Sequence, residues 1–262
     1  MMLQSLANKG IGIGCPSWIW PGDILMNVKR LLGLVDDVQL LFFESKEKES
    51  LPSDALIIEL HALRNELSYS VHLPVDVDLS SYESVETHLR FIEKTLRLDP
   101  QAYILHAAPD GRTLFNNDWR ERVHKHIAQI IERSGVPPEF LCLENQYYPF
   151  MEVEPIINDL RLSVCFDVGH VLNYEFDWHN YTQKYLPQTR VIHAQGYDAM
   201  TGKAHRDLQQ LNDSYLKDLL AFCLSEQSNV RLMTLEVFDE DKLMRSLQCL
   251  KNFHFCREAS CE

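Results

Sequence analysis

Acidic and imidazole side chains close the apolar, strand-like runs of this 262-residue sequence. In the stretch "SVCFDVGHVLNY" (163–174), Asp167 closes an apolar run and His170 follows three residues later. The pattern repeats: the residues that close six consecutive runs are His72, His106, Glu144, Asp167, His193 and Glu236. Imidazole and carboxylate groups without cysteine suit divalent zinc, manganese or iron, and the residue types alone do not choose among these metals.

A single residue of this kind has an ordinary explanation. A histidine at a strand end is commonly hydrogen-bonded or faces solvent, and an acid such as Asp167 caps the helix that follows it. Six such residues at equivalent strand ends need a common explanation. Ionised carboxylates at the edge of an apolar core are unfavourable unless they are paired or bind a cation. His170, one turn after its run, and His205, in a later loop, extend the predicted metal-ligand set to eight residues.

Glu144 is the candidate for a ligand that two metals share. It lies between ligand-bearing runs on both sides, and its two carboxylate oxygens allow it to bridge two ions. Paired metals about 3.5–4 Å apart are typical of enzymes that hydrolyse phosphate esters. We therefore expect two divalent ions per chain.

Strand-like and helix-like segments alternate through the whole chain. The strand-like runs cover residues 11–14, 38–43, 67–73, 102–107, 140–145, 163–168, 190–195 and 230–238. They are short and apolar almost throughout, as parallel strands buried on both faces are. Eight such units with no linker-like stretch predict an α/β fold, a single (β/α)8 TIM-barrel domain over residues 1–262, with a doubly wound open sheet as the competing fold.

The candidate ligands choose between these two folds. Six adjacent strands of an open sheet span about 24 Å at ~4.8 Å per gap. Metal–ligand bonds are only about 2.0–2.2 Å long, so strand ends that far apart cannot share a compact site. In a closed barrel the same strand ends surround one mouth, and the ligand pattern therefore favours the barrel.

Amphipathic stretches between the runs predict the helices. One begins at Asp23, a good N-cap, and stops at Gly33. Helical spacing predicts three further buried faces, made by Val85, Leu89, Ile92 and Leu96, by Val123, Ile127 and Ile130, and by Leu243, Leu247 and Leu250. After Asp167, Gly169 is expected to let the chain turn sharply enough for His170 to face the same site.

Charge and cysteine usage narrow the class of protein. The formal net charge is −13 and no basic patch is present, which disfavours nucleic acid as a partner. The seven cysteines are scattered and form no CxxC pair, which predicts a reduced, cytoplasmic chain. No apolar run approaches the ~18 residues that a membrane helix needs, so no membrane partner is expected.

The candidate ligands also carry a family resemblance. The whole chain resembles the xylose-isomerase-like barrel superfamily, which includes endonuclease IV and the sugar isomerases and epimerases. The resemblance implies a metal-binding set shared by the ketose epimerases and that nuclease: Glu144, Asp167, His193 and Glu236. It further implies that His72 and His106 bind a first metal and that His170, in "FDVGH", serves a third.

The sequence departs from the nuclease in "GKAHRDL", where His205 resembles the last residue of an Asp-x-His motif. Lys203 stands where that motif has its aspartate, and Asp207 does not have the spacing of a simple replacement. A cation beside His205 disfavours a third metal. Lys203 or Arg206 would instead supply positive charge directly to a phosphate, unless the segment is simply a solvated loop.

A closer resemblance is carried by the blocks "GIGCPSWIWP", "LLFFES", "SVHLPVDVDL", "LENQYYPF", "SVCFDVGHVLNY" and "TLEVF". Together they resemble the cobamide-remodelling phosphodiesterases of the same superfamily, across nearly the whole chain. The resemblance implies metal-dependent hydrolysis of the nucleotide loop of a cobamide, giving cobinamide phosphate and an α-riboside. Glu144 or Glu236 would accept the proton of water in that reaction.

Aromatic residues just past the strand ends suit such a substrate, because a corrin ring is large, flat and mostly apolar. The candidate substrate-binding residues are Trp18, Phe43, Asn145, Tyr147 and Tyr148. For any one aromatic ring, packing of a loop onto the barrel is the simpler explanation.

Three other functions remain open. The first is a sugar isomerase or epimerase with one divalent metal and with Glu144 and Glu236 as a proton-transfer pair. The second is an abasic-site endonuclease, which the negative charge and Lys203 disfavour. The third is a metal-dependent or corrinoid-binding module without hydrolysis. The additional histidines favour a site with several metals that acts on phosphate.

Overall fold

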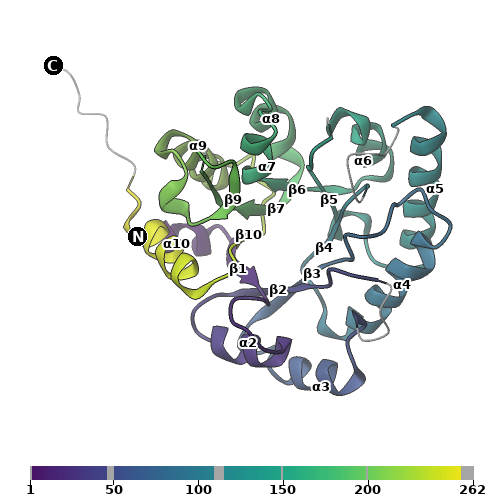
Figure 1. Ribbon diagram of the computed structural model, residues 1–262, viewed down its shortest axis with the longest axis horizontal. Helices are drawn as coiled ribbons and strands as arrows, with labels where there is room; N and C mark the ends of the chain where they lie inside the picture. Colours follow the sequence, from purple (N-terminus) through teal and green to yellow (C-terminus); the bar gives the residue numbers. More distant parts are fainter. Residues whose placement is uncertain (1, 46–49, 109–114, 149, 199, 255–262) are drawn as a thin grey trace.

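The protein is a closed barrel of parallel strands surrounded by helices. The computed structural model describes residues 2–45, 50–108, 115–148, 150–198 and 200–254. Within them, eight parallel strands close in the order β1-β10-β7-β6-β5-β4-β3-β2. Figure 1 shows the strands as an inner ring with the helices outside it. The prediction of a (β/α)8 barrel is confirmed, and the open sheet is excluded.

The barrel strands lie where the apolar runs predict them. They are β1 (Gly12–Pro16), β2 (Asp37–Leu41), β3 (Ser68–His72), β4 (Tyr103–Leu105), β5 (Leu141–Glu144), β6 (Ser163–Asp167), β7 (Thr189–Ala194) and β10 (Leu232–Leu235). After β7 the chain adds an antiparallel hairpin in the segment that the sequence predicts as a loop. Its strands are β8 (Gly196–Asp198) and β9 (Lys203–Arg206).

The helices follow the strands around the barrel. They are α1 (Met2–Asn8), α2 (Ile24–Leu31), α3 (Asp54–Ala62), α4 (Ser84–Thr95), α5 (Asn117–Ser134), α6 (Glu154–Leu160), α7 (Val168–Asn173), α8 (Trp178–Tyr185), α9 (Asp213–Leu224) and α10 (Glu240–Asn252). Short 3-10 turns are η2 (Leu96–Leu98), η3 (Pro138–Phe140), η4 (Phe150–Glu152), η5 (Leu186–Gln188) and η6 (Leu208–Gln210). As predicted, the Asp23 side chain caps α2 by accepting from the Met26 N–H. That helix ends at Leu31, two residues before Gly33.

The buried face of α4 differs from the prediction at one residue. Val85, Leu89 and Ile92 are buried, but Leu96 is 42% exposed. The α-helix ends at Thr95 and tightens into the 3-10 turn η2, whose different period rotates Leu96 out of the apolar stripe. Leu247 of α10 is also only partly buried, while Leu243 and Leu250 are fully buried.

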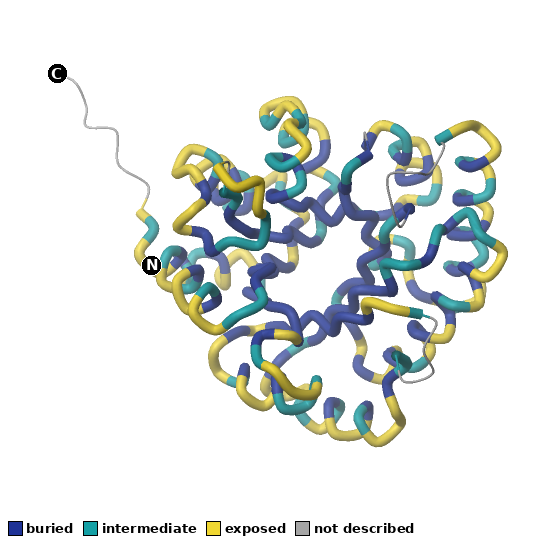
Figure 2. The backbone as a smooth tube through the Cα atoms, viewed as in Figure 1, coloured by how far each residue is buried: buried dark blue, intermediate teal, exposed yellow. Residues whose placement is uncertain are grey.

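The barrel interior has an apolar wall and a polar wall, and Figure 2 shows that most of the strand ring is buried. The apolar wall consists of Ala102, Ile104, Cys142, Cys165, Val191 and Leu232. On the other side, Asp37 and Gln39 of β2 face inward, because residues two apart on a strand share a face. Ser68 and Ser70 donate hydroxyl hydrogen bonds of 2.7 and 2.6 Å to Asp37, whose pKa burial raises to about 6.

Two further predictions concern the environment of the chain. Within the described residues, no helix combines the length and the apolar character needed to cross a membrane. The five described cysteines, at positions 15, 142, 165, 223 and 249, are free thiols. Cys256 and Cys261 lie outside the described residues.

The two leucines of α4 and η2 provide a test of this register. We expect Leu89→Ala to lower the free energy of unfolding by about 2–5 kcal/mol, because it empties a fully buried position. Leu96→Ala should change it by less than about 1 kcal/mol, because 42% of Leu96 is already exposed to water. Urea unfolding of the two variants beside the parent protein measures both values. Equal losses would contradict the register of α4.

Candidate metal centre

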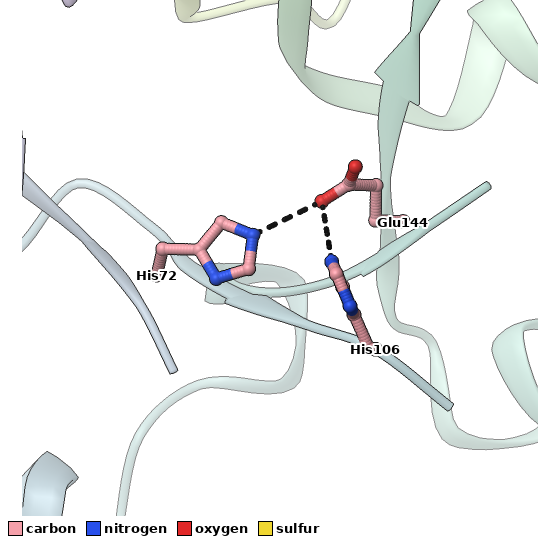
Figure 3. Close-up of side chains that lie close together, drawn as sticks. All are labelled: His72, His106 and Glu144. Atoms are coloured by element: carbon pink, nitrogen blue, oxygen red, sulfur yellow. Dashed lines mark hydrogen bonds and ion pairs between the residues drawn. The ribbon is translucent and has the colours of Figure 1, made fainter. Parts of the chain in front are cut away.

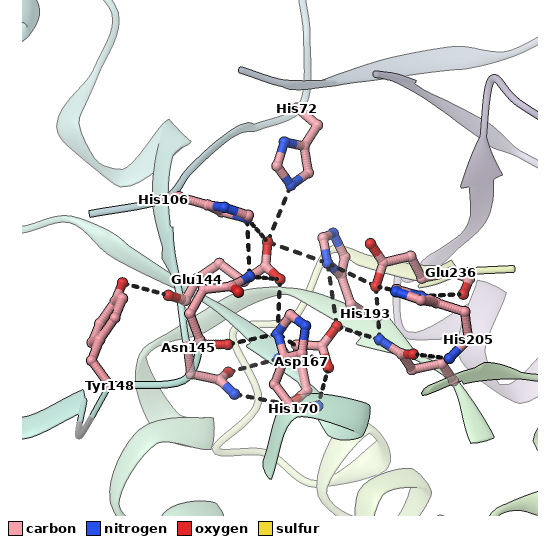
Figure 4. Close-up of polar contacts among 12 residues, drawn as sticks. His72, His106, Glu144, Asn145, Tyr148, Asp167, His170, His193, His205 and Glu236 are labelled. Atoms are coloured by element: carbon pink, nitrogen blue, oxygen red, sulfur yellow. Dashed lines mark hydrogen bonds and ion pairs between the residues drawn. The ribbon is translucent and has the colours of Figure 1, made fainter. Parts of the chain in front are cut away.

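All eight predicted ligands meet at the carboxyl end of the barrel (Figure 4). Most of them line a cavity of about 300 Å³, namely His72, His106, Glu144, His170, His205 and Glu236. Asp167 and His193 are fully buried and lie within 3.7 Å of those residues. Because the ligands come from different parts of the ring, closing the barrel brings together residues up to 164 positions apart in sequence, from His72 to Glu236.

The Glu144 carboxylate lies at the centre of the cluster. Its Oε2 is 3.2 Å from His72 Nε2 and 3.1 Å from His106 Nε2, as Figure 3 shows. The same oxygen is 3.5 Å from His193 Nδ1, and Oε1 is 3.3 Å from His170 Nδ1. Glu144 therefore contacts four imidazoles from four different elements, as a ligand shared by two ions would.

A second group of ligand atoms surrounds His193, which also approaches Glu144 Oε2. His193 Nδ1 is 3.7 Å from Asp167 Oδ2 and 3.6 Å from Glu236 Oε2. These three residues and the group of His72, His106 and Glu144 each hold their ligand atoms within 4.8 Å of one another. Two further such groups are Glu144 with Asp167 and His170, and Glu144 with Cys165 and His193.

Backbone hydrogen bonds fix the ring state of three histidines. His72 Nδ1 lies 3.0 Å from Leu73 O, and His170 Nδ1 lies 2.9 Å from Asn145 O. His205 Nδ1 lies 3.3 Å from Glu236 O. A carbonyl oxygen only accepts, so each Nδ1 donates, and in the neutral ring Nε2 keeps its lone pair.

This arrangement fits a metal centre. The His72 Nε2 lone pair faces the Glu144 carboxylate across 3.2 Å, and two acceptors at that distance need a cation or a proton between them. Histidines that bind metals usually donate their other ring N–H to a carbonyl or a carboxylate, as these three do. The residues present therefore match a divalent ion in their types, their number and their hydrogen bonding.

Burial and mutual repulsion perturb the acids of the centre. Burial, together with the negative charges of Asp167 and Glu144, raises the pKa of Glu236 well above its ordinary value. Burial also acts to raise the pKa of Glu144, but the charges of His193 and His106 outweigh it and hold that pKa well below the ordinary range. The neighbouring carboxylates thus differ in their readiness to hold a proton.

The histidines of the centre are perturbed in both directions. Burial acts to lower the pKa of His170, but Asp167 and Glu144 outweigh it and raise that pKa to about 9. Burial lowers the pKa values of His106 and His205 below the ordinary value. In the metal-free protein at neutral pH, His170 therefore carries a proton that a metal ion would displace.

Two glutamines hold the carboxylates, and neither was among the residues predicted from the sequence. Gln146 Nε2 donates to Glu144 Oε1 at 2.8 Å and contacts His106 Nε2 at 3.0 Å. Gln195 Nε2 donates to Asp167 Oδ2 at 2.6 Å and to Glu236 Oε2 at 2.8 Å. Each follows a predicted ligand by two positions, and the period-2 alternation of a strand places it on the same face. That spacing is the signal that could have identified them.

The structure corrects the reason for Gly169. This glycine is not at a sharp turn but inside helix α7, at the point where Gln195 packs against it. A Cβ at this position would lie 2.4 Å from Gln195 Cδ. Gly169 is therefore needed for the close approach of the amide that joins Asp167 to Glu236, and not for conformational freedom.

Asp167 combines the two roles that the sequence left open. Its Oδ1 accepts from the His170 N–H at 2.6 Å and caps α7, and its Oδ2 faces Gln195 and His193. Asn145, expected to bind substrate, instead holds the Asp167 backbone: it accepts from Asp167 N at 2.7 Å and donates to Asp167 O at 2.9 Å. With both amide groups used and the side chain buried, Asn145 is a support of the centre.

The aromatic candidates divide between the mouth and the core. Trp18 and Phe43 are each 43% exposed and their rings lie 6.1 Å apart, with Phe43 on the wall of the cavity. Tyr148, also expected to bind substrate, is fully buried, and its hydroxyl donates to Glu144 O at 3.0 Å. Tyr147 is half-buried between Tyr148 and Tyr174 and does not line the described cavity.

The cations predicted to contact a phosphate lie on the β8–β9 hairpin and outside the described lining of the cavity. Lys203 is exposed at the start of β9. Arg206 is half-buried, with Nη2 3.9 Å from Asp198 Oδ2. Asp207 is buried and bound to Arg245 at 2.9 Å, so it does not reach the centre. The structure does not bring Lys203 and Arg206 together with the eight ligands.

Solved structures with the same fold include sugar epimerases and an endonuclease. A D-tagatose 3-epimerase-like protein aligns with a TM-score of 0.70 and 18% identity, over 92% of this chain and 96% of its own. Endonuclease IV from Thermus thermophilus aligns with a TM-score of 0.70 and 19% identity, over 92% and 97%. D-psicose 3-epimerase from Clostridium cellulolyticum gives 0.65 and 16%, over 93% and 98%.

These similarities establish the fold, which is that of the xylose-isomerase-like TIM barrels. No protein-family model matches the sequence, and a search of curated proteins finds no match. At identities below 20% in those three structures, the choice among activities depends on the residues of the centre itself.

The protonation of the metal-free centre leads to a prediction about metal binding. We expect zinc binding at pH 7.5 to release about one proton or more, because His170, with a pKa of about 9, must deprotonate to become a ligand. Metal binding and folding therefore depend on pH in opposite ways. Charged His170 disfavours metal binding, but it stabilises the metal-free fold at low pH, and that contribution to stability is lost as pH rises through about 9.

Titration calorimetry in buffers of different ionisation enthalpy counts the protons released. The variant His170→Gln should release about one proton fewer than the parent protein. The control is His124→Gln, because His124 is a half-exposed residue of α5 that pairs with Asp159 away from the centre. A binding heat that does not depend on the buffer would contradict the prediction.

Proposed function

We propose that this chain is a metal-dependent enzyme that hydrolyses the phosphodiester in the nucleotide loop of a cobamide. The observation that carries the proposal is the position of Glu144 between two groups of ligands. Its Oε2 is approached by His72 and His106 at 3.2 and 3.1 Å and also by His193, which lies next to Asp167 and Glu236, at 3.5 Å. A single tetrahedral site uses three or four protein ligands, so eight converging candidates favour two ions.

The chain's own residues suit attack on a phosphate. Divalent ions held here would supply positive charge to the phosphate oxygens and to the reacting water. Burial and the charges of Asp167 and Glu144 raise the pKa of Glu236 well above its ordinary value, which favours its protonated form and suits a group that transfers a proton. His205 lines the cavity with its side chain 38% exposed, which allows it to contact a bound substrate. Glu144 is held from four sides and is better suited to be a shared ligand.

The fold is compatible with phosphodiester chemistry, since endonuclease IV has a similar structure. A nucleic-acid substrate is disfavoured, because the formal charge of −13 repels a polyphosphate backbone. The proposed partner is therefore a small molecule, with neither nucleic acid nor membrane involved. The free thiols suit the reducing compartment that a cytoplasmic enzyme would occupy.

A groove beside the centre supports a large apolar substrate. It has a volume of about 650 Å³ and lies between the amino ends of α2 and α3, with Trp18, Ile24, Leu56 and Ile58 on its walls. Trp18 contacts Phe43, which lines the cavity of the centre, so one pair of rings separates the two spaces. A cobamide is too large for the 300 Å³ cavity, and the groove offers its apolar part a surface.

A sugar epimerase is the second candidate. Epimerases are among the similar structures, and Glu144 and Glu236 both approach His193 Nδ1, at 3.5 and 3.6 Å, as a pair of proton-transfer groups around one metal would. Histidines 72, 106, 170 and 205 would have no evident task in that reaction. Such a small polar substrate would also leave the apolar groove empty.

Product analysis is the first test of this proposal. Incubation of adenosylcobalamin with the metal-loaded protein should yield cobinamide phosphate and α-ribazole, detected by mass spectrometry, and a chelator should prevent both. Asp167→Ala should abolish turnover because it removes a buried ligand, while circular dichroism reports an intact fold. The absence of product after loading with zinc, manganese and iron(II) in turn would favour the epimerase.

The groove allows a separate prediction about substrate size. Ile58→Glu should raise KM for the cobamide about tenfold or more, because Ile58 is 54% exposed on the groove wall and the charge disfavours an apolar ligand. Turnover of a small aryl phosphodiester, which does not reach the groove, should stay unchanged. Leu96→Glu is the matched control, because Leu96 is an exposed leucine at the opposite end of the barrel. Equal KM values in both variants would remove the groove from the substrate site.

A further inference from the structure

His193 differs from three other histidines of the centre in how its ring is held. His72, His170 and His205 each donate Nδ1–H to a backbone carbonyl. His193 instead places Nε2 3.0 Å from Nε2 of Gln39. Its Nδ1 is buried with no hydrogen bond to the described residues and lies 3.5–3.7 Å from the three carboxylates of the centre.

The contact with Gln39 crosses the barrel. Gln39 is on β2 and His193 on β7, and β1 and β10 stand between these strands in the barrel order. Both side chains are fully buried. A glutamine that spans the interior to meet one ring nitrogen fixes the orientation of that ring.

The amide orientation leaves an unmet acceptor. With Nε2 of Gln39 donating to His193 Nε2, the oxygen Oε1 of Gln39 is buried without a partner among the described residues. A buried polar atom without a hydrogen bond has lost its hydrogen bonds to water without a replacement, which destabilises the fold. In the neutral ring this orientation also places the proton on Nδ1, the atom that faces the carboxylates, so the lone pair is directed away from the centre.

The opposite amide orientation resolves the conflict at His193, and it places the Gln39 amide nitrogen instead of the oxygen at the buried position that has no partner among the described residues. Oxygen and nitrogen of an amide have nearly the same size, and a rotation of 180° exchanges them without moving any neighbour. Oε1 then accepts from His193 Nε2–H, and the Nδ1 lone pair faces the three carboxylates. His193 thereby acquires the pattern of His72, His170 and His205, with one ring nitrogen donating to an oxygen and the other free to bind a metal.

We propose that Gln39 is a positioning residue that accepts the Nε2–H of His193 through its amide oxygen and so fixes Nδ1 as the metal-binding atom. The proposal concerns only the metal-binding state of the centre. It therefore applies equally to a phosphodiesterase and to an epimerase, and it does not depend on the proposed substrate.

Two substitutions at Gln39 distinguish an acceptor from a donor. Gln39→Glu can accept from Nε2–H but cannot donate, and it should keep the zinc dissociation constant within about threefold of the parent value. Gln39→Leu can do neither and should weaken zinc binding about 10–100-fold, the usual effect of losing a partner of a metal-binding histidine. Competition with a chromophoric chelator measures both constants without any assay of activity.

Ser70→Ala is the matched control. Ser70 is the register partner of Gln39 on β3, is fully buried, and donates its hydroxyl hydrogen bond to Asp37 rather than to His193. Its loss should leave the zinc dissociation constant unchanged. A Gln39→Glu variant that loses zinc as severely as Gln39→Leu would overturn the proposal, because an amide donor would then be required.

Nitrogen-15 NMR of the zinc-loaded parent protein provides a readout that needs no variant to fold. We expect His193 to show a protonated Nε2 and a zinc-bound Nδ1. A zinc-loaded His193 with its proton on Nδ1, or bound to zinc through Nε2, would overturn the proposal. Failure of the protein to hydrolyse cobamides would affect neither experiment.

Discussion

Three buried carboxylates among five imidazoles form the constraint on which the rest of the structure depends. Glu144, Asp167 and Glu236 are each at most 6% exposed, and the negative charges of Asp167 and Glu144 repel a charge on Glu236. Such a cluster is stable only when cations or protons balance it and when each oxygen has a partner. The closed barrel supplies the convergence, since only a ring of strands brings six strand ends to one point.

Much of this centre could be predicted from the sequence because its signal is periodic. A ligand type at the end of each apolar run marks where a parallel strand leaves the barrel, and that edge is shared by all the strands. The same logic, extended by two residues, would have found Gln146 and Gln195. The expectation that six separate strand ends share one site required a closed barrel, and the fold has that form.

The remaining features could not be predicted, because they depend on distances between residues far apart in sequence. Asn145 and Tyr148 stand beside a ligand as substrate-binding residues would, yet both turn inward to hold the backbone of Asp167 or Glu144. Gln39 lies 154 positions from the ring that it holds. Gly169 carries no sign in the sequence that a glutamine side chain packs on it. Local patterns identify a residue's element and face, but they do not identify its partner across the barrel.

The β8–β9 hairpin has a consequence for how such a centre can change over time. Seven of the eight ligands lie on barrel strands, directly after them, or on the first turn of α7, whereas His205 lies on a two-stranded ribbon outside the barrel. It adopts a left-handed backbone, with φ of 55°, and is held there by Gln195 and by the carbonyl of Glu236. Exchange of that ribbon for another loop would remove or replace one ligand and leave the other seven in place. The ribbon that carries His205 can therefore change in evolution independently of the strands that carry the inner ligands. New chemistry can arise by altering this surface ribbon while the barrel stays constant.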